Sequence, residues 1–495
     1  MTLIKTLRGS ADSICRKKEN HRAEKPVSRT GSSIVQSFTS RENKLIRFFQ
    51  TKLQNLISDK KFSQILTGSV WALGARVIST LLAMITTIII ARVYGPEIIG
   101  VMAIIASFLS FATIFTIMGT NTSILRLIPE YMAKHSATSA FILYRRIQYL
   151  VAGVSVFTGC LLFIFSDLIA TRLFSKPHLS FLFALAAIFV GSLSIMNLNT
   201  QAVRALQLIR TFAIMQLLPG FSKLLILLAL MFIFSNPYLP VYALFGAYFF
   251  TALFGAVIMH RAFKRKTAQS DLIVHMPVKE ILGISLPMLM TSTLTFMIAQ
   301  TGVIMLGMFR PETEVGYYDI AVRLATLTTF VLTSINSMAA PKFSELYHTG
   351  KMEELFYVAK KSAKLIFWTT LPILLVLVFI GKPILNLFFG PDFTAAYPAM
   401  VLLLIAQFVN SISGSTGYFM NMTDNQNVFR NIILGAAIVT VALGFLLIPT
   451  FGINGAAFAG MISIVFWNIT TIIYIKMKYN NSISYIPFIR IFKTH

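Results

Sequence analysis

Long apolar runs follow one another along almost the whole chain, and no other feature of the sequence constrains the fold as strongly. A helix needs about 20 apolar residues to cross the hydrocarbon core of a bilayer, and runs of that length recur from residue 66 to residue 475. Since lipid offers no partner for backbone polar groups, such runs predict helices. We therefore predict an all-α polytopic membrane protein with about 12 transmembrane helices. The predicted spans are 66–91, 97–120, 147–169, 179–202, 212–235, 239–260, 281–308, 315–339, 365–388, 394–420, 428–449 and 453–475.

The basic residues between these spans predict the orientation of the chain. Charged residues make up only 12% of the sequence, and hydrophobic residues make up 56%. The loops on the N-terminal side carry 17 Lys or Arg, and the loops on the other side carry 5. By the positive-inside rule, both termini are predicted to be cytoplasmic in a plasma (inner) membrane. The net charge of +25 is then explained by cytoplasmic loops that contact anionic lipids, without nucleic acid.

Residues 1–64 differ from the rest of the chain. They contain 14 Lys or Arg, 5 Asp or Glu, and no apolar run long enough to span a membrane. We interpret them as a basic cytoplasmic extension, in which residues 43–58 are predicted to form an amphipathic helix on the inner leaflet.

The chain repeats itself at an offset of about 215 residues. IIARVYGPEIIGVM (89–102) is echoed by LGMFRPETEVGYYD (306–319), again a helix end, a charged Pro-Glu turn and a glycine that opens the next helix. This indicates two six-helix lobes, 65–262 and 280–476, joined by a basic cytoplasmic linker, 263–279, and followed by a cytoplasmic tail, 477–495. Because six is even, both lobes share one orientation, and we predict a pseudo-twofold axis along the membrane normal with alternating access between the lobes.

Several chemistries have no support in the sequence. Two cysteines, Cys15 and Cys160, and seven scattered histidines predict no disulfide, metal site or Cys-His nucleophile. A phosphate-binding glycine loop is absent as well, so we expect no cofactor. A membrane-embedded glycosyltransferase or polymerase would need catalytic acids and a sizeable external loop, whereas the predicted external loops have about ten residues or fewer. We therefore predict a transporter, not an enzyme.

Four short motifs resemble a known family. They are Ala91-Arg92-Val93-Tyr94-Gly95-Pro96-Glu97 with Gly100, Val315-Gly316-Tyr317-Tyr318 with Ala321, Leu387-Phe388-Phe389-Gly390, and Gly452-Ile453-Asn454-Gly455-Ala456-Ala457. Over residues 65–476 the chain resembles the polysaccharide-biosynthesis or O-antigen flippases of the multidrug, oligosaccharidyl-lipid and polysaccharide exporter superfamily. The resemblance implies transport of a polyprenyl-diphosphate-linked oligosaccharide from the inner to the outer leaflet. A glycan polymerase or glycosyltransferases are the partners expected alongside it.

Three cations in the predicted spans are candidates for binding the diphosphate: Arg76, Lys223 and Arg323. Each costs at least about 2.5 kcal/mol to place against lipid, so each should face the protein interior or a watery cavity. For Arg323 a structural ion pair with Asp319, four residues earlier, is the alternative. For Arg76 and Lys223 the alternative is a bond to a carbonyl or to an acid of another helix. Pro219-Gly220 predicts a kink or break beside Lys223.

Side-chain amides gather in two of the spans, in MNLNTQ (196–201) and NSISGSTGYFMN (410–421). These segments match under the internal repeat, so both lobes are predicted to present polar groups to one chamber. The candidate glycan contacts are Asn197, Asn199, Gln201 and Asn410. Packing of small and polar residues between helices is the alternative explanation.

Energy coupling is left open by the sequence. Asp319 is the one acid deep in a predicted span, which makes it the candidate for coupling to a proton or sodium gradient; simple downhill exchange is the alternative. A cation-coupled multidrug exporter of the same superfamily is the second functional hypothesis. A cationic substrate favours a negative cavity, whereas Arg76, Lys223, Arg323 and Asp319 sum to +2.

Overall fold

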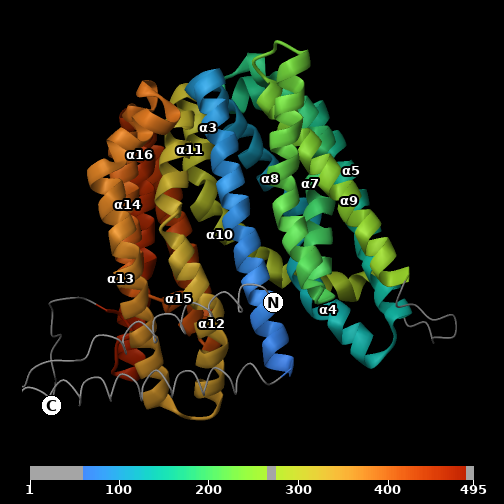
Figure 1. Cartoon of the computed structure of the whole chain (residues 1–495), viewed down its shortest axis with the longest axis vertical. Coiled ribbons are helices and arrows are strands. Elements are labelled where there is room, and N and C mark those ends of the chain that lie inside the picture. The colour runs from blue at the N-terminus through green and yellow to red at the C-terminus, as the bar shows by residue number, and fades with distance from the viewer. Residues whose placement is uncertain (1–59, 265–274, 486–495) are drawn as a thin grey trace, which may run out of the picture. The chain divides into compact units, whose positions relative to one another are not determined.

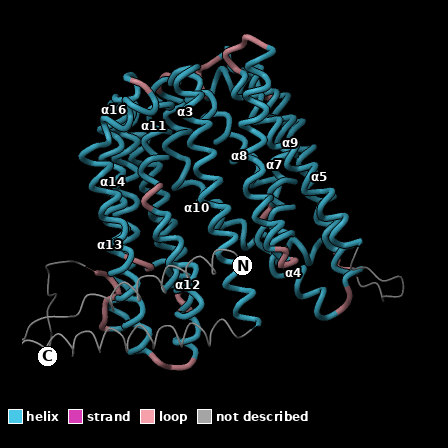
Figure 2. Tube along the Cα trace, in the orientation of Figure 1, coloured by secondary structure: helices cyan, strands magenta, loops and turns pink. Residues whose placement is uncertain are grey.

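The computed structural model describes residues 60–264 and 275–485, and within these ranges every regular element is a helix (Figure 2). Among the described residues, nine helices are long and apolar enough to cross a membrane, or ten if the bent pair formed by α11 and α12 is one span. This confirms an all-α, multi-pass membrane protein. The predicted amphipathic helix at 43–58 and most of the predicted linker lie outside the described residues.

The helices before the linker pack mainly on one another, and we call residues 70–264 the N-half. In this half α7 packs against α4, α5, α8 and α9, and Figure 1 shows α5 and α7 side by side. The elements are α3 (Lys60–Ile117), α4 (Thr120–Lys134), α5 (Ala137–Ile164), α6 (Ser166–Leu168), η1 (Ile169–Leu173), η2 (Pro177–Leu179), α7 (Ser180–Ala205), α8 (Ile209–Ile233) and α9 (Leu239–Lys264).

The helices after the linker form a second set, and we call residues 275–485 the C-half. Here α16 packs against α10, α14 and α15, and α12 packs against α13 (Figure 1). The elements are α10 (Val278–Phe309), α11 (Glu312–Thr326), α12 (Thr329–His348), α13 (Met352–Ile384), η3 (Leu385–Phe389), η4 (Pro391–Ala396), α14 (Tyr397–Ser413), α15 (Thr416–Met422) and α16 (Gln426–Tyr479).

Two of the long elements contain a glycine at which the helix stops and restarts. In α3 this is Gly95, with φ 77°, followed by Pro96, as the sequence predicted. In α16 it is Gly452, with φ 52°. The hydroxyl of Thr440 donates to that of Ser463 at 2.7 Å, so the two parts of α16 lie side by side as a hairpin. A left-handed φ favours glycine at both turns. Counting each part separately agrees with twelve spans, although that number and the pseudo-twofold stay predictions.

Helices extend beyond the apolar runs that predicted them. Helix α5 begins at Ala137, ten residues before the predicted start at 147, so Arg145 and Arg146 lie on a helix and not in a loop. Likewise α12 continues to His348, past the predicted end at 339. Charged residues limit the depth at which a segment can lie in a membrane, but they do not end its helical hydrogen bonding.

The predicted break in the fifth span is not observed. Helix α8 runs through Pro219 without interruption, and a hydrogen bond of 3.1 Å from the Ser79 hydroxyl to the Gln216 carbonyl supports the backbone in this turn. The break lies instead between α11 and α12, which are bent by 45° around Leu327 and Thr328. Proline removes one backbone donor, which neighbouring groups can compensate.

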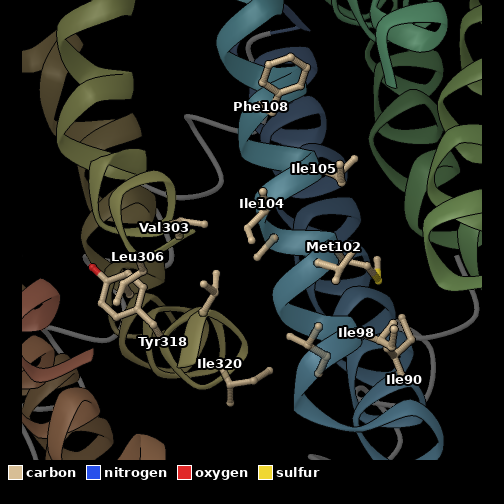
Figure 3. Packing of buried hydrophobic residues seen from close by; sticks show 14 of the residues in the cluster. Ile90, Ile98, Met102, Ile104, Ile105, Phe108, Val303, Leu306, Tyr318 and Ile320 are labelled. Atoms are coloured by element: carbon tan, nitrogen blue, oxygen red, sulfur yellow. The ribbon is translucent and has the colours of Figure 1, made fainter. Parts of the chain in front are cut away.

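A continuous apolar core joins the two halves along α3, α10 and α11. Figure 3 shows Val303 and Leu306 of α10 on the side that faces Ile104 of α3. The fit is close, because a Cβ on Gly307 would lie 3.0 Å from Cγ1 of Ile104. The seam between the halves is therefore packed in this region, and it places the cavities described below at defined positions along it.

Candidate functional site

A cavity of about 330 Å³ lies between α3 of the N-half and the bend from α11 to α12 of the C-half. It brings together two of the cations predicted from the sequence, Arg76 and Arg323. We call it the cation pocket. Its other lining residues are Ser79, Thr80, Ala83, Met84, Thr87, Thr326, Leu327, Thr329 and Phe330.

Arg323 is paired with Asp319, as the sequence alternative proposed. Its Nε lies 2.5 Å from Oδ2 of Asp319, one helical turn away. The Arg323 side chain is nevertheless 45% exposed, whereas that of Asp319 is 15% exposed. The guanidinium therefore keeps donors free toward the cation pocket while one edge holds the carboxylate.

Arg76 is exposed, and its guanidinium carbon lies 5.7 Å from the ring centroid of Phe330. This cation–π contact joins α3 to α12 across the seam. Among the described residues, no acid lies within 4.0 Å of Arg76. Arg76 thus lacks the structural acid partner that the sequence left open.

Lys223 is half-buried on α8 and lies within electrostatic range of both Arg323 and Asp319. It does not line the cation pocket itself. Arg323 is therefore the common neighbour: it shares a cavity with Arg76 and an electrostatic environment with Lys223. The four groups carry three positive charges and one negative charge, so this region has a net charge of +2.

A second cavity, of about 320 Å³, is lined by neutral residues of α3, α7 and α10 and by the turn after α3. It includes Asn197, one of the predicted glycan contacts, and we call it the neutral pocket. The residues that line it are Ser110, Thr113, Ile114, Ile117, Gly119, Asn121, Leu193, Asn197 and Leu289.

Two of the other predicted glycan contacts hold helices together within one half. Asn199 is fully buried; its Oδ1 accepts from the Tyr144 hydroxyl at 2.7 Å, and its Nδ2 donates to the Ala252 carbonyl at 3.2 Å. Asn410 is 9% exposed and donates to Oε1 of Gln407 at 3.2 Å. Both side chains are thus committed to helix packing, which was the alternative explanation.

Gln201 is the remaining predicted contact, and it lies in neither pocket. It is half-buried, and its Oε1 has no hydrogen-bond partner among the described residues. The structure therefore brings only Asn197, of the four predicted amides, to a cavity between the halves.

The halves also meet where α3 turns at Gly95, and we call this region the hairpin end (residues 92–100, 176–178 and 310–316). Glu312 is almost buried there and binds Lys176 at 3.1 Å and His178 at 3.0 Å. Arg92 donates from Nε to the Phe388 carbonyl at 3.1 Å. Each of these contacts joins a cation or imidazole of the N-half to an acceptor of the C-half. Sequence reasoning placed Glu312 only in an external loop, and its position in the repeated Pro-Glu turn was the one available signal.

Two glycines make the closest approach at the hairpin end. A Cβ on Gly100 would lie 1.8 Å from the carbonyl oxygen of Glu312, and a Cβ on Gly316 would lie 2.0 Å from that of Pro96. The contact is reciprocal in the sequence, because Glu312 follows Pro96 by 216 residues and Gly316 follows Gly100 by 216 residues. A twofold axis between the halves would produce such reciprocity, so the contact supports the predicted pseudo-twofold.

The comparisons with known proteins agree with this architecture. The chain is 21% identical over 417 residues to the uncharacterized membrane protein MJ1068 of Methanocaldococcus jannaschii, covering 79% of this chain and 80% of that protein. It is 27% identical to the probable flippase AglR of Haloferax volcanii, over 34% of this chain and 36% of that protein. Its fold is similar to an inward closed conformation of the lipid II flippase MurJ, with a TM-score of 0.62 at 14% identity, over 81% of this chain and 86% of that one.

A family model described as polysaccharide biosynthesis protein matches residues 65–347, more than half of the chain. The matched segment contains Arg76, Lys223, Asp319 and Arg323, as well as the residues that meet at the hairpin end. With its many apolar helices, the protein is a multi-pass membrane transporter of the flippase kind. The chain belongs to the polysaccharide biosynthesis protein family.

Proposed function

We propose that the protein is an alternating-access flippase that moves a polyprenyl-diphosphate-linked oligosaccharide from the inner to the outer leaflet of the plasma membrane. The observation that carries this proposal is the excess of positive charge between the halves, where Arg76, Lys223 and Arg323 share a single acid, Asp319. A diphosphate that leaves water needs charge-assisted hydrogen bonds. The exposed guanidinium groups of Arg76 and Arg323 offer such bonds in a planar fork.

The direction of transport follows from the predicted orientation. The hairpin end lies on the side with few basic residues, so by the positive-inside rule it faces outward. Its ion pairs and glycine contact hold the halves together there, and a substrate would then enter the cation pocket from the opposite, cytoplasmic side. Enzymes that assemble the glycan on its lipid, or that polymerise it afterwards, are the partners this function implies.

Reporter fusions test the orientation. Fusions after Lys361 are expected to report a cytoplasmic position, and fusions after Lys176 an external one. The opposite result would place the hairpin end in the cytoplasm and remove the proposed direction of transport, while leaving the cation pocket unaffected.

A cation-coupled multidrug exporter is the second candidate, and the electrostatics favour it less. A cationic drug would meet a site with a net charge of +2, and its one acid, Asp319, is already held by Arg323 at 2.5 Å. Coupling through Asp319 is still compatible with either function, because a proton or sodium ion would compete with Arg323 for the same carboxylate.

Transport in vesicles distinguishes the candidates. The purified protein is reconstituted with a fluorescent polyprenyl-diphosphate oligosaccharide, and flipping is measured by loss of accessibility to an added quencher. Replacing both Arg76 and Arg323 by Gln is expected to lower the flipping rate by about 100-fold or more, since two charge-assisted bonds are lost. The matched control is Arg172→Gln, an exposed arginine of η1 with no ion pair within 4.0 Å among the described residues. Unchanged flipping by the double variant, at normal protein level, would remove the cation pocket from the mechanism.

A further inference from the structure

The neutral pocket differs from the cation pocket in chemistry, although both lie along the seam between the halves. Its nine lining residues include no ionisable side chain. Four of them carry hydroxyl or amide groups, namely Ser110, Thr113, Asn121 and Asn197, and the rest are apolar or glycine. Ligand pockets generally combine apolar walls with a few polar groups that fix orientation.

The two amides in this pocket have hydrogen-bonding capacity to spare. Asn197 is half-buried and has no hydrogen-bond partner among the described side chains and backbone groups, in contrast to Asn199, whose amide is bonded on both atoms. Asn121 accepts one long bond from the Thr122 hydroxyl, 3.4 Å, at Oδ1. Each amide therefore presents NH₂ donors, and Asn197 also presents a free carbonyl oxygen.

The two hydroxyls are committed in a way that leaves acceptors facing the pocket. Ser110 donates to the Ala106 carbonyl at 2.7 Å, and Thr113 donates to the Leu109 carbonyl at 2.7 Å. A hydroxyl whose hydrogen is bound in this manner still has oxygen lone pairs to offer. Together the four side chains offer donors and acceptors without a net charge, which matches a ligand whose own groups both donate and accept.

The pocket includes a constrained turn that touches the other half. Met118 and Gly119, between α3 and α4, have φ angles of 50° and 77°. A Cβ on Gly119 would lie 2.2 Å from the Ser285 carbonyl oxygen of α10, and the Ser123 and Ser285 hydroxyls lie 2.7 Å apart. The wall contributed by Leu289 of α10 is thus fixed against a turn of the N-half, so a ligand here contacts both halves.

We propose that the neutral pocket is a subsite for one uncharged sugar unit of the transported glycan. The proposal rests on the flippase function proposed above and adds to it the class of sugar recognised. A sugar hydroxyl donates and accepts at once, as the amides and hydroxyls of this pocket require. A volume of about 320 Å³ is at the lower end of the range for ligand pockets, which suits a single sugar unit and not a long chain.

Paired probes test the subsite on the purified full-length protein in lipid nanodiscs. The first probe is polyprenyl diphosphate without sugar, and the second is the same lipid carrying one neutral hexose. Wild-type protein is expected to bind the second probe more tightly. Asn197→Leu and Thr113→Val are each expected to lose about fivefold of that advantage, the equivalent of one neutral hydrogen bond, without changing the affinity for the bare lipid. Retained binding of the bare lipid also shows that the variants are folded.

The matched control is Thr200→Val, on α7. Its hydroxyl donates to the Met196 carbonyl at 2.8 Å, as that of Thr113 does to Leu109, but Thr200 does not line the pocket. An unchanged hexose advantage in the Asn121→Leu, Asn197→Leu double variant would overturn the subsite and leave the flippase proposal standing. Wild-type protein that binds neither probe would overturn the flippase proposal itself, and the subsite with it. A stronger advantage for an anionic sugar than for the hexose would contradict the uncharged class.

Discussion

The hairpin end and the cation pocket both lie between the two halves, but they balance charge in opposite ways. At the hairpin end each described ion pair is complete: Lys176 and His178 share Glu312, and Arg310 binds Glu314 at 2.8 Å. In and around the cation pocket, three cations have one acid among them. Buried charges that serve only the fold are paired, so the unpaired excess marks the region that awaits an anion. Completeness of pairing, more than burial, separates the structural contact from the binding site.

The largest stability effect is expected from Glu312→Gln. The side chains of Lys176 and Glu312 are 9% and 11% exposed, so the change leaves a buried ammonium without its carboxylate. Breaking a buried pair from one side costs about 3–5 kcal/mol. The measurement is thermal unfolding in detergent, with the Lys176→Met, Glu312→Gln double variant as the comparison, because removal of both charges should restore part of the loss. Equal stability of the single variant and wild type would show that the hairpin end is not held by this pair.

Gly100→Ala is expected to have the next largest effect. Its methyl group would lie 1.8 Å from the Glu312 carbonyl oxygen, so the two backbones must separate. Forced overpacking costs about 1–3 kcal/mol. In a background in which Cys15 and Cys160 are replaced, a single cysteine at Thr87 of the cation pocket should react faster with an impermeant reagent added outside.

The control for this change is Gly153→Ala on α5, where a Cβ would meet nothing within 4 Å. It should leave both stability and labelling unchanged. Slow labelling of both variants would mean that the glycine contact does not close the hairpin end to the outside.

Asp319→Asn is expected to have a smaller effect on stability, about 1 kcal/mol, because Arg323 is 45% exposed and water compensates much of the lost pair. Its effect on transport is the sharper readout. If Asp319 couples a cation gradient to transport, the variant should still flip lipid downhill in vesicles but no longer respond to an imposed gradient. A full response to the gradient would limit Asp319 to orienting Arg323.

Glu130→Gln should change least. Glu130 binds Lys134 at 2.6 Å on the surface of α4, and that hydrogen bond lowers the pKa of the carboxyl. Exposed pairs of this kind contribute little, so no shift in Tm is expected between pH 5 and pH 8. A clear loss of stability here would blur the distinction between paired surface charges and the buried pairs of the hairpin end.

Much of the fold could be predicted from hydropathy, because lipid requires apolar runs wherever a helix crosses it. The turn at Gly95-Pro96 and the cations Arg76 and Arg323 were predicted for the same reason. Partners were harder to foresee. Lys176 and Glu312 lie 136 residues apart, and nothing local pairs them. Similarly, an asparagine that packs helices, such as Asn199, and one that faces a cavity, such as Asn197, look alike until their neighbours are known.

Breaks in helices were also beyond the reach of local sequence. Pro219 predicted one, yet α8 continues, since the hydroxyl of Ser79 on another helix supplies a hydrogen bond in that turn. The bend of 45° at Leu327 and Thr328 occurs without proline or glycine. Whether a helix bends thus depends on what surrounds it, and the surroundings come from the rest of the chain.

The reciprocal contact of Gly100 and Gly316 has a consequence for how this chain is assembled. A surface in which each part touches the counterpart of its own partner is self-complementary. Two separate copies of one half would present the same surface to each other, so the two-domain chain is equivalent to a homodimer whose subunits have been joined end to end. Once joined, the two copies are free to differ, and one side can keep Arg92 while the other keeps Glu312. Fusion therefore allows an asymmetric binding site to form along an interface whose backbone contact is still symmetric.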